Sequence, residues 1–463
     1  MSKRIILLFS FVLLLILLNG IIFSQIFPSF FFADDFYILN IIKEFNVNNV
    51  LSGIIMLSTK HFFTPLPFLA AWIVYQVFGL NPSGYYLLNF TFHLSNAILI
   101  YFIFMKISKN KSIAIPSAIL FIVYCGNWES LGWTGAVNHI IYAFFMLLTI
   151  LWYIYDLYLC SLFAFMLAIF SHETALFILP ALLSLYEVFI HGTNIKPLFR
   201  RIAPYLIISF FFLMFKIYRE IFVVQIISEG YYNIGFHFIS NYLGCISTLI
   251  VPITSSYRSA SVLLLKYLAV ISIIKIMVIL FVPFIVYVLF KYGSKLVKFL
   301  AASILLILLP YSFFDLQIVS RYLYEASIFF TCLIVVILES VVKRSNIKAM
   351  VLSFLIIINL SGMYLYQKAF YEKKELRRSI IKEYLIYGLH IKPGASLCFI
   401  DLPVREDEIE SMIYLWDAKA KHTIHVYNAD NVYYKQTYNK NTKYNCNYVF
   451  VYDCIKRRLS LLP

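Results

Sequence analysis

Charged residues are scarce in this chain of 463 residues. Only 13% of them are Asp, Glu, Lys or Arg, whereas 62% are hydrophobic and the mean hydropathy is +0.83. In a soluble globular domain about a quarter of the residues are charged. The shortage of charge therefore excludes a soluble globular protein and indicates an integral membrane protein.

Cysteine is also sparse, and no cysteine pattern typical of a metal site is present. The seven cysteines are scattered, without a CxxC motif or a Cys/His spacing of the kind that binds structural zinc. Four lie in or beside apolar segments, where a free cysteine is usually a small hydrophobe: Cys125, Cys160, Cys245 and Cys332. The other three are in the polar tail, which has room for one disulfide if it lies outside the cytoplasm: Cys398, Cys446 and Cys454.

The formal net charge of +15 is unevenly distributed. Residues 1–366 carry 22 basic and 12 acidic side chains, and residues 367–463 carry 16 and 11. We interpret 1–366 as a membrane domain with basic loops and 367–463 as a small domain of ordinary soluble composition. Nucleic-acid binding has no support beyond the charge itself.

Apolar runs predict a polytopic bundle of about eleven transmembrane helices, each run being long enough to cross a bilayer with some tilt. The first extends from residue 5 to 27 and lacks a convincing cleavage site, so we interpret it as an uncleaved span. The other runs are 84–105, 112–125, 139–155, 157–171, 174–191, 203–222, 276–290, 299–314, 326–342 and 349–366.

Basic loops orient these spans in a plasma (inner) membrane. When the runs alternate across the bilayer, every basic cluster in a short loop falls on the side of the N-terminus, which is therefore cytoplasmic. This threading requires that 65–78 and 236–254 lie in or on the outer leaflet. It also places residues 367–463 outside the cytoplasm.

The tail is predicted to be a small α/β domain. A charged helical stretch at 368–387 leads to the turn Lys392-Pro393-Gly394. Short β-like runs follow at 396–400, 423–427 and 448–452, with a helix at 407–416 between the first two.

Ionisable residues gather at the outer ends of the predicted spans, so any chemistry is expected on the outer face. Asp34 and Asp35 follow the first span, and adjacent carboxylates near hydrocarbon can shift each other's pKa, as suits a general base. The alternative is that one of them caps the next helix. Arg321, surrounded by tyrosines, fits recognition of a phosphate, or else a salt bridge with Asp315 or Glu325.

Three further sites are weaker candidates. Glu129 lies in a short outer hairpin, where an acid is more often solvated than functional. The His172-Glu173 pair opens a span, and an acid is favourable at a helix N-terminus in any case. His93 and Asn96, inside an apolar stretch, are expected to make interhelical hydrogen bonds.

The order of these motifs resembles the polytopic GT-C glycosyltransferases, over roughly residues 5–340. It is most similar to bacterial relatives of the O-mannosyltransferases with tetratricopeptide tails. The motifs that carry the resemblance are Asp34-Asp35, Thr64-Pro65-Leu66, Phe78 to Tyr85, then Asn89, His93 and Asn96, Glu129, Ser171-His172-Glu173 and Arg321-Tyr322-Leu323-Tyr324. Three features depart from that branch: Thr64 replaces a common Arg, His172 replaces a Lys, and no tetratricopeptide repeat follows.

The resemblance implies transfer of a sugar from a polyprenyl-phosphate carrier to a saccharide, lipid or protein acceptor at the outer face, with inversion. Asp34 or Asp35 is then the catalytic base, and Arg321, with Arg258 as a second candidate, binds the donor phosphate. Glu129, His172, Glu173 and His93 support the site. No cofactor is certain, but the oxygens of Asp34, Asp35 and Glu129 are of the type that binds Mg²⁺ or Mn²⁺.

Two other functions remain open at this stage. A flippase or transporter of lipid-linked saccharides is also polytopic and basic inside, although transporters usually place ionisable groups near the midplane and in paired halves. A polysaccharide polymerase or ligase is closer in chemistry, but we expect it to have a large Arg-rich outer loop. The longest internal outer loop, about 223–275, holds only Arg258, Lys266 and Lys275.

Overall fold

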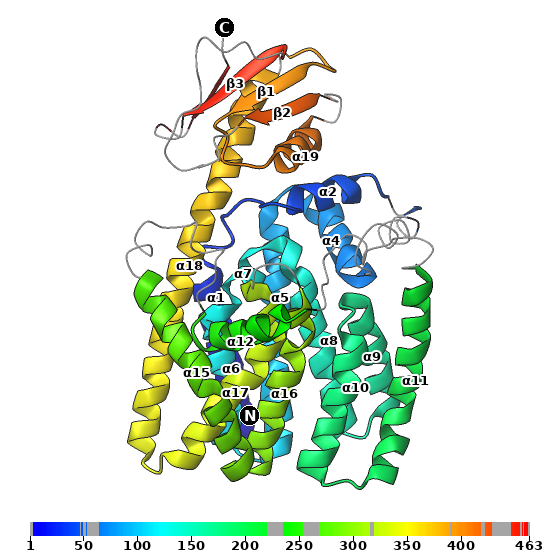
Figure 1. The fold of residues 1–463 in the computed structure, drawn as a ribbon, viewed down its shortest axis with the longest axis vertical. Helices are drawn as coiled ribbons and strands as arrows, with labels where there is room; N and C mark the ends of the chain where they lie inside the picture. Colours follow the sequence, from blue (N-terminus) through cyan, green and yellow to red (C-terminus); the bar gives the residue numbers. More distant parts are fainter. Residues whose placement is uncertain are drawn as a thin grey trace.

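A computed structural model shows a long helical bundle with a small sheet at one end (Figure 1). It describes residues 3–46, 48–49, 52, 64–219, 235–252, 268–314, 319–388, 391–417, 422–427, 446–453, 456 and 458–461. Arg258, Asp315 and Cys454, which the sequence analysis singled out, lie outside them.

Up to Gly388, most of the described residues are helical. They are α1 (Lys3–Phe23), α2 (Asp35–Lys43), α4 (Pro65–Phe78), α5 (Pro82–Ser108), α6 (Lys111–Val123), α7 (Trp128–Gly132), α8 (Val137–Ile154), α9 (Tyr158–Ser171), α10 (Ala175–Tyr186), α11 (Ile195–Arg219), α12 (His237–Ile250), α15 (Leu268–Tyr292), α16 (Lys295–Leu308), α17 (Tyr324–Val341) and α18 (Ser345–Gly388). Short 3-10 turns and one π-helical turn, η3 (Glu187–His191), join some of them.

Each of the eleven predicted apolar runs coincides with a helix. In the described part of the chain, seven helices are long and apolar enough to cross a membrane, or eight if α6 and α7, which meet at a bend of 44°, form one broken span. The remaining runs fall on the shorter apolar helices Phe9–Phe23, Tyr158–Ser171 and Ala175–His191. The protein is thus a polytopic helical bundle, and the total of about eleven spans stays a prediction.

Local sequence signals explain where several helices begin. Asn81 caps α5 by accepting a hydrogen bond from the Ser83 N–H at 3.1 Å, and Pro82 occupies the first helical position. Gly79 ends α4 with a φ of +56°, a value that favours glycine. This break separates the short helix α4 from the long helix α5.

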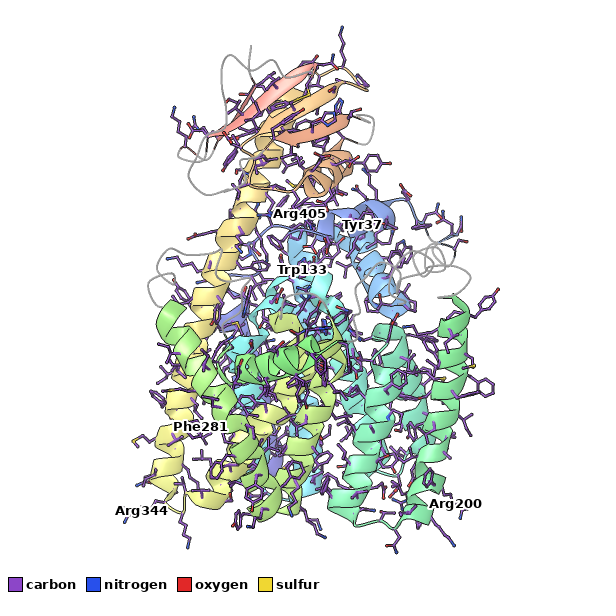
Figure 2. The ribbon with its side chains drawn as sticks, viewed as in Figure 1. Tyr37, Trp133, Arg200, Phe281, Arg344 and Arg405 are labelled. Atoms are coloured by element: carbon purple, nitrogen blue, oxygen red, sulfur yellow. A yellow bond between two sulfur atoms is a disulfide. The ribbon has the colours of Figure 1, made fainter. Side chains whose placement is uncertain are left out.

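The two ends of the bundle differ in their neighbours. Figure 1 shows α2 and α4 at the end that faces the sheet, whereas the turns between α10 and α11 and between α17 and α18 lie at the opposite end. Arg200 and Arg344 are at that opposite end, and Arg405 is near the sheet (Figure 2). We call these the basic end and the cap end. The helix α12 lies across the bundle rather than along it, as expected for a segment that does not span.

The C-terminal residues form a four-stranded sheet with a covering helix. Its strands β1 (Ser396–Ile400), β2 (Thr423–Tyr427), β3 (Tyr448–Asp453) and β4 (Arg458–Leu461) are arranged in the order β2-β1-β3-β4. β1 is parallel to β2 and β3, and β4 is antiparallel to β3. The helix α19 (Glu406–Trp416) connects β1 to β2, and a disulfide joins Cys398 to Cys446.

The sheet and α19, which we call the cap, share a core with the segment that follows α1. One cluster of buried side chains contains Phe30, Phe31 and Phe36 together with cap residues such as Ile413 and Phe450. The helix α18 runs unbroken for 44 residues, about 66 Å, from the basic end into the cap. The predicted domain boundary at 366 therefore falls inside a helix, and the division into two domains stays a prediction.

Candidate active site at the cap end

The Asp34-Asp35 pair lies in a sharp turn between α1 and α2. We call residues 32–35 the acidic turn. Ala33 has a φ of +51°, a left-handed conformation that costs a non-glycine residue roughly 1–2 kcal/mol. The turn sends the two neighbouring carboxylates in different directions. The Asp34 side chain is 59% exposed, whereas Asp35 is buried.

Neither carboxylate caps α2. Asp34 is in the N-cap position but makes no side-chain hydrogen bond to the helix. Asp35 accepts the N–H of Phe32, which precedes the helix, at 2.9 Å. The described contacts therefore do not support the capping alternative for either carboxylate.

Asp35 is held inside the protein near a buried ammonium group. Burial raises the pKa of its carboxyl group above the usual value, although the hydrogen bond from the Phe32 N–H and the positive charge of Lys374 act in the opposite direction. The Nζ of Lys374 donates to the hydroxyls of Ser29 at 3.0 Å and Tyr86 at 2.8 Å, and to the carbonyl of Gly132. Asp35 thus belongs to a packed polar network, and Asp34 is the accessible acid.

Asp34 faces two arginines from distant parts of the chain. Its Oδ1 lies 3.6 Å from a guanidinium nitrogen of Arg405, which also pairs with Asp407 at 3.1 Å. Burial raises the pKa of Asp34, and the positive charges of Arg405 and Arg321 lower it. The side chain is exposed enough for solvent to weaken all of these effects.

Arg321 pairs with Glu129 across 192 residues of sequence. One guanidinium nitrogen donates to Oε1 of Glu129 at 2.6 Å, and the Arg321 backbone N–H donates to Oε2 at 3.1 Å. Glu129 is buried, so the expectation of a solvated acid is wrong, and Arg321 remains 22% exposed. Asp315 and Glu325 were the salt-bridge partners considered for Arg321. Glu325 is bonded to His139 at 2.9 Å instead, and Asp315 lies outside the described residues.

Trp133 connects Arg321 to the acidic turn. The guanidinium carbon of Arg321 lies 4.7 Å from the centre of the Trp133 ring, and the indole N–H of Trp133 donates to the carbonyl of Phe32 at 3.0 Å. Figure 2 shows Trp133 at the cap end, below Arg405. Four residues predicted from the sequence are thus brought to one place: Asp34, Asp35, Glu129 and Arg321.

His172 and Glu173 lie in a neighbouring cluster. The His172 ring contacts the rings of His139 at 5.0 Å and Tyr142 at 5.5 Å, and Glu173 forms an ion pair with Lys216 on α11. Tyr322 joins this cluster to Arg321, because its ring lies 5.9 Å from His139 and 5.0 Å from the guanidinium carbon. The cluster therefore borders the site without contacting Asp34 in any interaction that the structure describes.

His93 lies deeper in the bundle. Its Nδ1 is 2.7 Å from the hydroxyl of Tyr324, and its Nε2 is 3.2 Å from the carbonyl of Ile122. Asn96 donates to the same tyrosine hydroxyl at 3.1 Å. These contacts join α5, α6 and α17, so His93 supports the helices beneath the site.

The carboxylates named as possible metal ligands lie in one region, but the structure does not place them to hold an ion together. Both oxygens of Glu129 accept hydrogen bonds from Arg321, and an oxygen of Asp35 accepts the Phe32 N–H. Among the described residues, no group of three or more His, Cys, Asp or Glu side chains is placed to hold a metal ion. We therefore derive no step through a divalent cation, and a role for Mg²⁺ or Mn²⁺ stays untested.

Sequence reasoning missed four residues of this region. Trp133, Arg377, Arg405 and Glu408 all contact the acidic turn or its partners. The two glycines that flank Trp133-Thr134 are the one local signal in the sequence. The structure explains Gly132, because a Cβ there would lie 2.6 Å from Oε1 of Gln367. The cap residues give no signal, because their contacts depend on how the cap folds back.

Comparison with solved structures identifies the fold. The chain aligns with the crystal structure of ArnT from Cupriavidus metallidurans in the apo state, at 12% sequence identity and a TM-score of 0.52, covering 93% of this chain and 87% of that one. The crystal structure of ArnT from the same organism bound to undecaprenyl phosphate covers the same shares, at 11% identity and a TM-score of 0.46. No protein-family model and no curated protein sequence gives a significant match.

The protein is thus a polytopic membrane protein with an ArnT-like GT-C fold. This confirms the fold class that the sequence motifs implied. The narrower resemblance to relatives of the O-mannosyltransferases is a prediction that these comparisons leave open.

Proposed function

We propose that this protein is a membrane glycosyltransferase that transfers a sugar from a polyprenyl-phosphate donor to an acceptor hydroxyl at the outer face of the plasma membrane. One observation carries the proposal. The exposed carboxylate of Asp34 and the partly exposed guanidinium of Arg321 lie within electrostatic reach of each other at one end of a GT-C fold. A base and a phosphate-binding cation are the two groups that this chemistry needs.

The reaction follows from these two groups. Asp34 accepts the proton of the acceptor hydroxyl while the oxygen of that hydroxyl bonds to the anomeric carbon of the sugar. The bond between that carbon and the phosphate oxygen breaks on the opposite face, so the configuration inverts. Arg321 stabilises the phosphate that leaves with the bonding electrons, and no general acid is required.

The remaining polar groups hold these two in place. Glu129 fixes one edge of the Arg321 guanidinium, and Trp133 covers its face, so the arginine enters the reaction in a defined orientation. Asp35 accepts the Phe32 N–H and so supports the turn that presents Asp34. The donor class is proposed from the resemblance of the motifs and from the position of Arg321 at the end of the spans.

Two features support an outer-face site. The basic end, with Arg200 and Arg344, is cytoplasmic under the positive-inside rule, so the cap end lies outside. The disulfide between Cys398 and Cys446 belongs to an oxidising compartment. A reporter fused after residue 463 that reads out in the cytoplasm would overturn this orientation.

The test compares Asp34→Asn with Asp35→Asn in purified protein supplied with a polyprenyl-phosphate sugar. We expect Asp34→Asn to lower turnover by about 100-fold or more, because an amide cannot accept the proton, while donor binding and thermal stability persist. Asp35→Asn should reduce turnover less, because an amide oxygen can still accept the Phe32 N–H.

Glu410→Gln is the matched control, since it removes an exposed carboxylate from α19, the helix that also carries Glu408. Full turnover in Asp34→Asn with none in Asp35→Asn would reverse the assignment of the base. Wild-type protein that transfers no sugar from any polyprenyl-phosphate donor would refute the proposed function.

A further inference from the structure

The backbone of the acidic turn is held from the cap as well as from the bundle. On the bundle side, Asp35 accepts the Phe32 N–H and Trp133 donates to the Phe32 carbonyl. On the cap side, the Ala33 N–H donates to Oε1 of Glu408 at 3.1 Å. Ala33 is the residue in the left-handed conformation, so this bond fixes the point where the chain reverses direction.

Glu408 is itself held in a single orientation. Arg377, on α18, donates from Nε to Oε1 at 2.8 Å and from a terminal nitrogen to Oε2 at 3.1 Å. Such a two-point contact fixes the plane of the carboxylate. Glu408 is 5% exposed and Arg377 is also buried, so water competes little for these bonds. The guanidinium carbon of Arg377 also lies 4.5 Å from the centre of the Phe32 ring.

Neighbouring basic residues of α18 hold the start of the same segment. Arg378 donates to the carbonyl of Pro28 at 2.8 Å, and Lys374 donates to the hydroxyl of Ser29 at 3.0 Å. With Arg377, which lies on the Phe32 ring, they share one face of α18, and together they contact the segment between Pro28 and Phe32. Figure 1 shows α18 passing this segment on its way from the bundle to the sheet.

A purely local role for Glu408 does not explain these contacts. An acid in the first turn of a helix is favourable, and a glutamate three residues after the N-cap often bonds back to the N-cap N–H. Glu408 holds that position in α19, whose N-cap is Arg405. Its two oxygens instead accept hydrogen bonds from α18 and from the acidic turn.

We propose that Glu408, oriented by Arg377, is a positioning residue that holds the strained turn so that Asp34 points at the acceptor. Through Glu408 the cap thus takes part in positioning the base. This inference deepens the proposed function and rests on it where turnover is concerned. A shift of the turn by about 1 Å is enough to reduce the rate of a positioned reaction by as much as 100-fold.

The test uses full-length protein carrying Glu408→Ala, Glu408→Gln or Arg377→Lys, with Glu410→Gln as the control on the same helix. We expect Glu408→Ala to lower kcat about 10- to 100-fold with little change in the donor KM. The kcat of Glu408→Gln should lie between those of the wild type and Glu408→Ala, because the amide oxygen can still accept the Ala33 N–H. Arg377→Lys should lower kcat too, because an ammonium cannot hold both oxygens in one plane.

Hydrogen exchange gives a readout that does not depend on activity. Amides of the peptide covering residues 28–36 should exchange faster in Glu408→Ala, and peptides from α8 and α16 should not change. Unchanged exchange in 28–36 together with wild-type kcat would overturn the positioning role. If residues 28–36 exchange faster in Glu408→Ala but the wild-type protein transfers no sugar, Glu408 holds the turn as inferred and only the glycosyltransferase function is refuted.

Where Glu408→Ala does not fold, Ala33→Gly decides the question. Glycine adopts the left-handed conformation without strain, so Glu408→Gln combined with Ala33→Gly should recover part of the kcat lost by Glu408→Gln alone. Failure of this rescue, with both proteins folded, would contradict the proposal.

Discussion

Each end of the bundle contains a buried glutamate paired with an arginine, and the two pairs differ in what surrounds them. At the basic end, Glu187 bonds Arg201 at 2.8 Å, Tyr153 at 2.7 Å and the hydroxyl of Thr193. These partners close the π-helical turn η3 and the loop that follows it. At the cap end, the hydrogen bonds that the structure describes for the Glu129 side chain all come from Arg321.

The arginines differ in the same way. In the ion pairs that the structure describes, Arg201 pairs with Glu187, which is buried, and with no exposed acid. Arg321 lies between two aromatic rings and attracts Asp34, whose side chain is exposed. An ion pair of similar geometry therefore stabilises a loop at one end and orients a cation toward an open acid at the other. Distance alone does not separate these roles, but the neighbouring groups do.

The largest expected effect on activity comes from breaking the Glu129–Arg321 pair at the cap end. Arg321→Ala should lower turnover by about 100-fold or more and weaken donor binding, because both the phosphate contact and the stabilisation of the leaving group are lost. Arg321→Lys should recover only part of this loss, since a point charge cannot replace the planar fork.

Glu187→Gln is the control at the basic end, and kinetics with thermal unfolding separate the two outcomes. We expect Glu187→Gln to lower the unfolding temperature and to leave kcat and donor affinity unchanged. Normal turnover of Arg321→Ala and Arg321→Lys at wild-type donor concentration would make the cap-end pair structural like the other.

A smaller effect, on the pH dependence of kcat, tests the role of Asp34 as the base. The charge of Arg405 lowers the pKa of Asp34, so Arg405→Ala should raise that pKa. Because the base must be ionised to accept a proton, the acidic limb of the kcat profile should move to higher pH, and turnover should fall at low pH but not at high pH. The shift should shrink as salt is added, since the side chains are exposed. An unmoved acidic limb would remove Asp34 as the titrating base.

The smallest effect on activity is expected from the disulfide of the cap. Cys398→Ser should destabilise the cap by about 2–4 kcal/mol, because the bond closes a loop between residues 48 apart in sequence. The hydrogen bond from the cap to the backbone of the acidic turn comes from Glu408 on α19, which Arg377 on α18 orients, whereas the disulfide joins β1 to Cys446, just before β3. Turnover at low temperature should therefore change little. Proteolysis of the cap at rising temperature measures the first effect, and a large loss of turnover in an intact cap would contradict the second.

The cap illustrates how far local sequence patterns reach. Its first two strands were predicted with the boundaries observed, the third to within one residue, and α19 to within a residue of its start, because alternation and turn residues are local signals. The strand β4 was missed. Its four residues gain strand structure from pairing with β3, which their own sequence does not reveal.

The candidate site shows the opposite limit. The sequence located Asp34, Asp35, Glu129 and Arg321 as polar residues at the outer ends of spans, since charge is costly in the membrane. It could not pair them. The ion-pair partners considered for Arg321 as the alternative to a phosphate were its sequence neighbours Asp315 and Glu325, yet its partner in the structure is 192 residues away. The contacts made by Glu408 and Arg405 were equally out of reach, because they depend on the cap folding back over the acidic turn.

The unbroken helix α18 makes the site sensitive to chain length in a way that substitution does not. Gln367, which bonds the bundle, and Lys374, Arg377 and Arg378, which hold residues 28 to 33, share one helix. Adding or deleting one residue between 367 and 374 turns everything beyond it by about 100° and shifts it by about 1.5 Å. The rotational phase between bundle and cap is therefore fixed by the number of residues in this stretch, and insertions here are expected to be far less tolerated than exchanges of side chains.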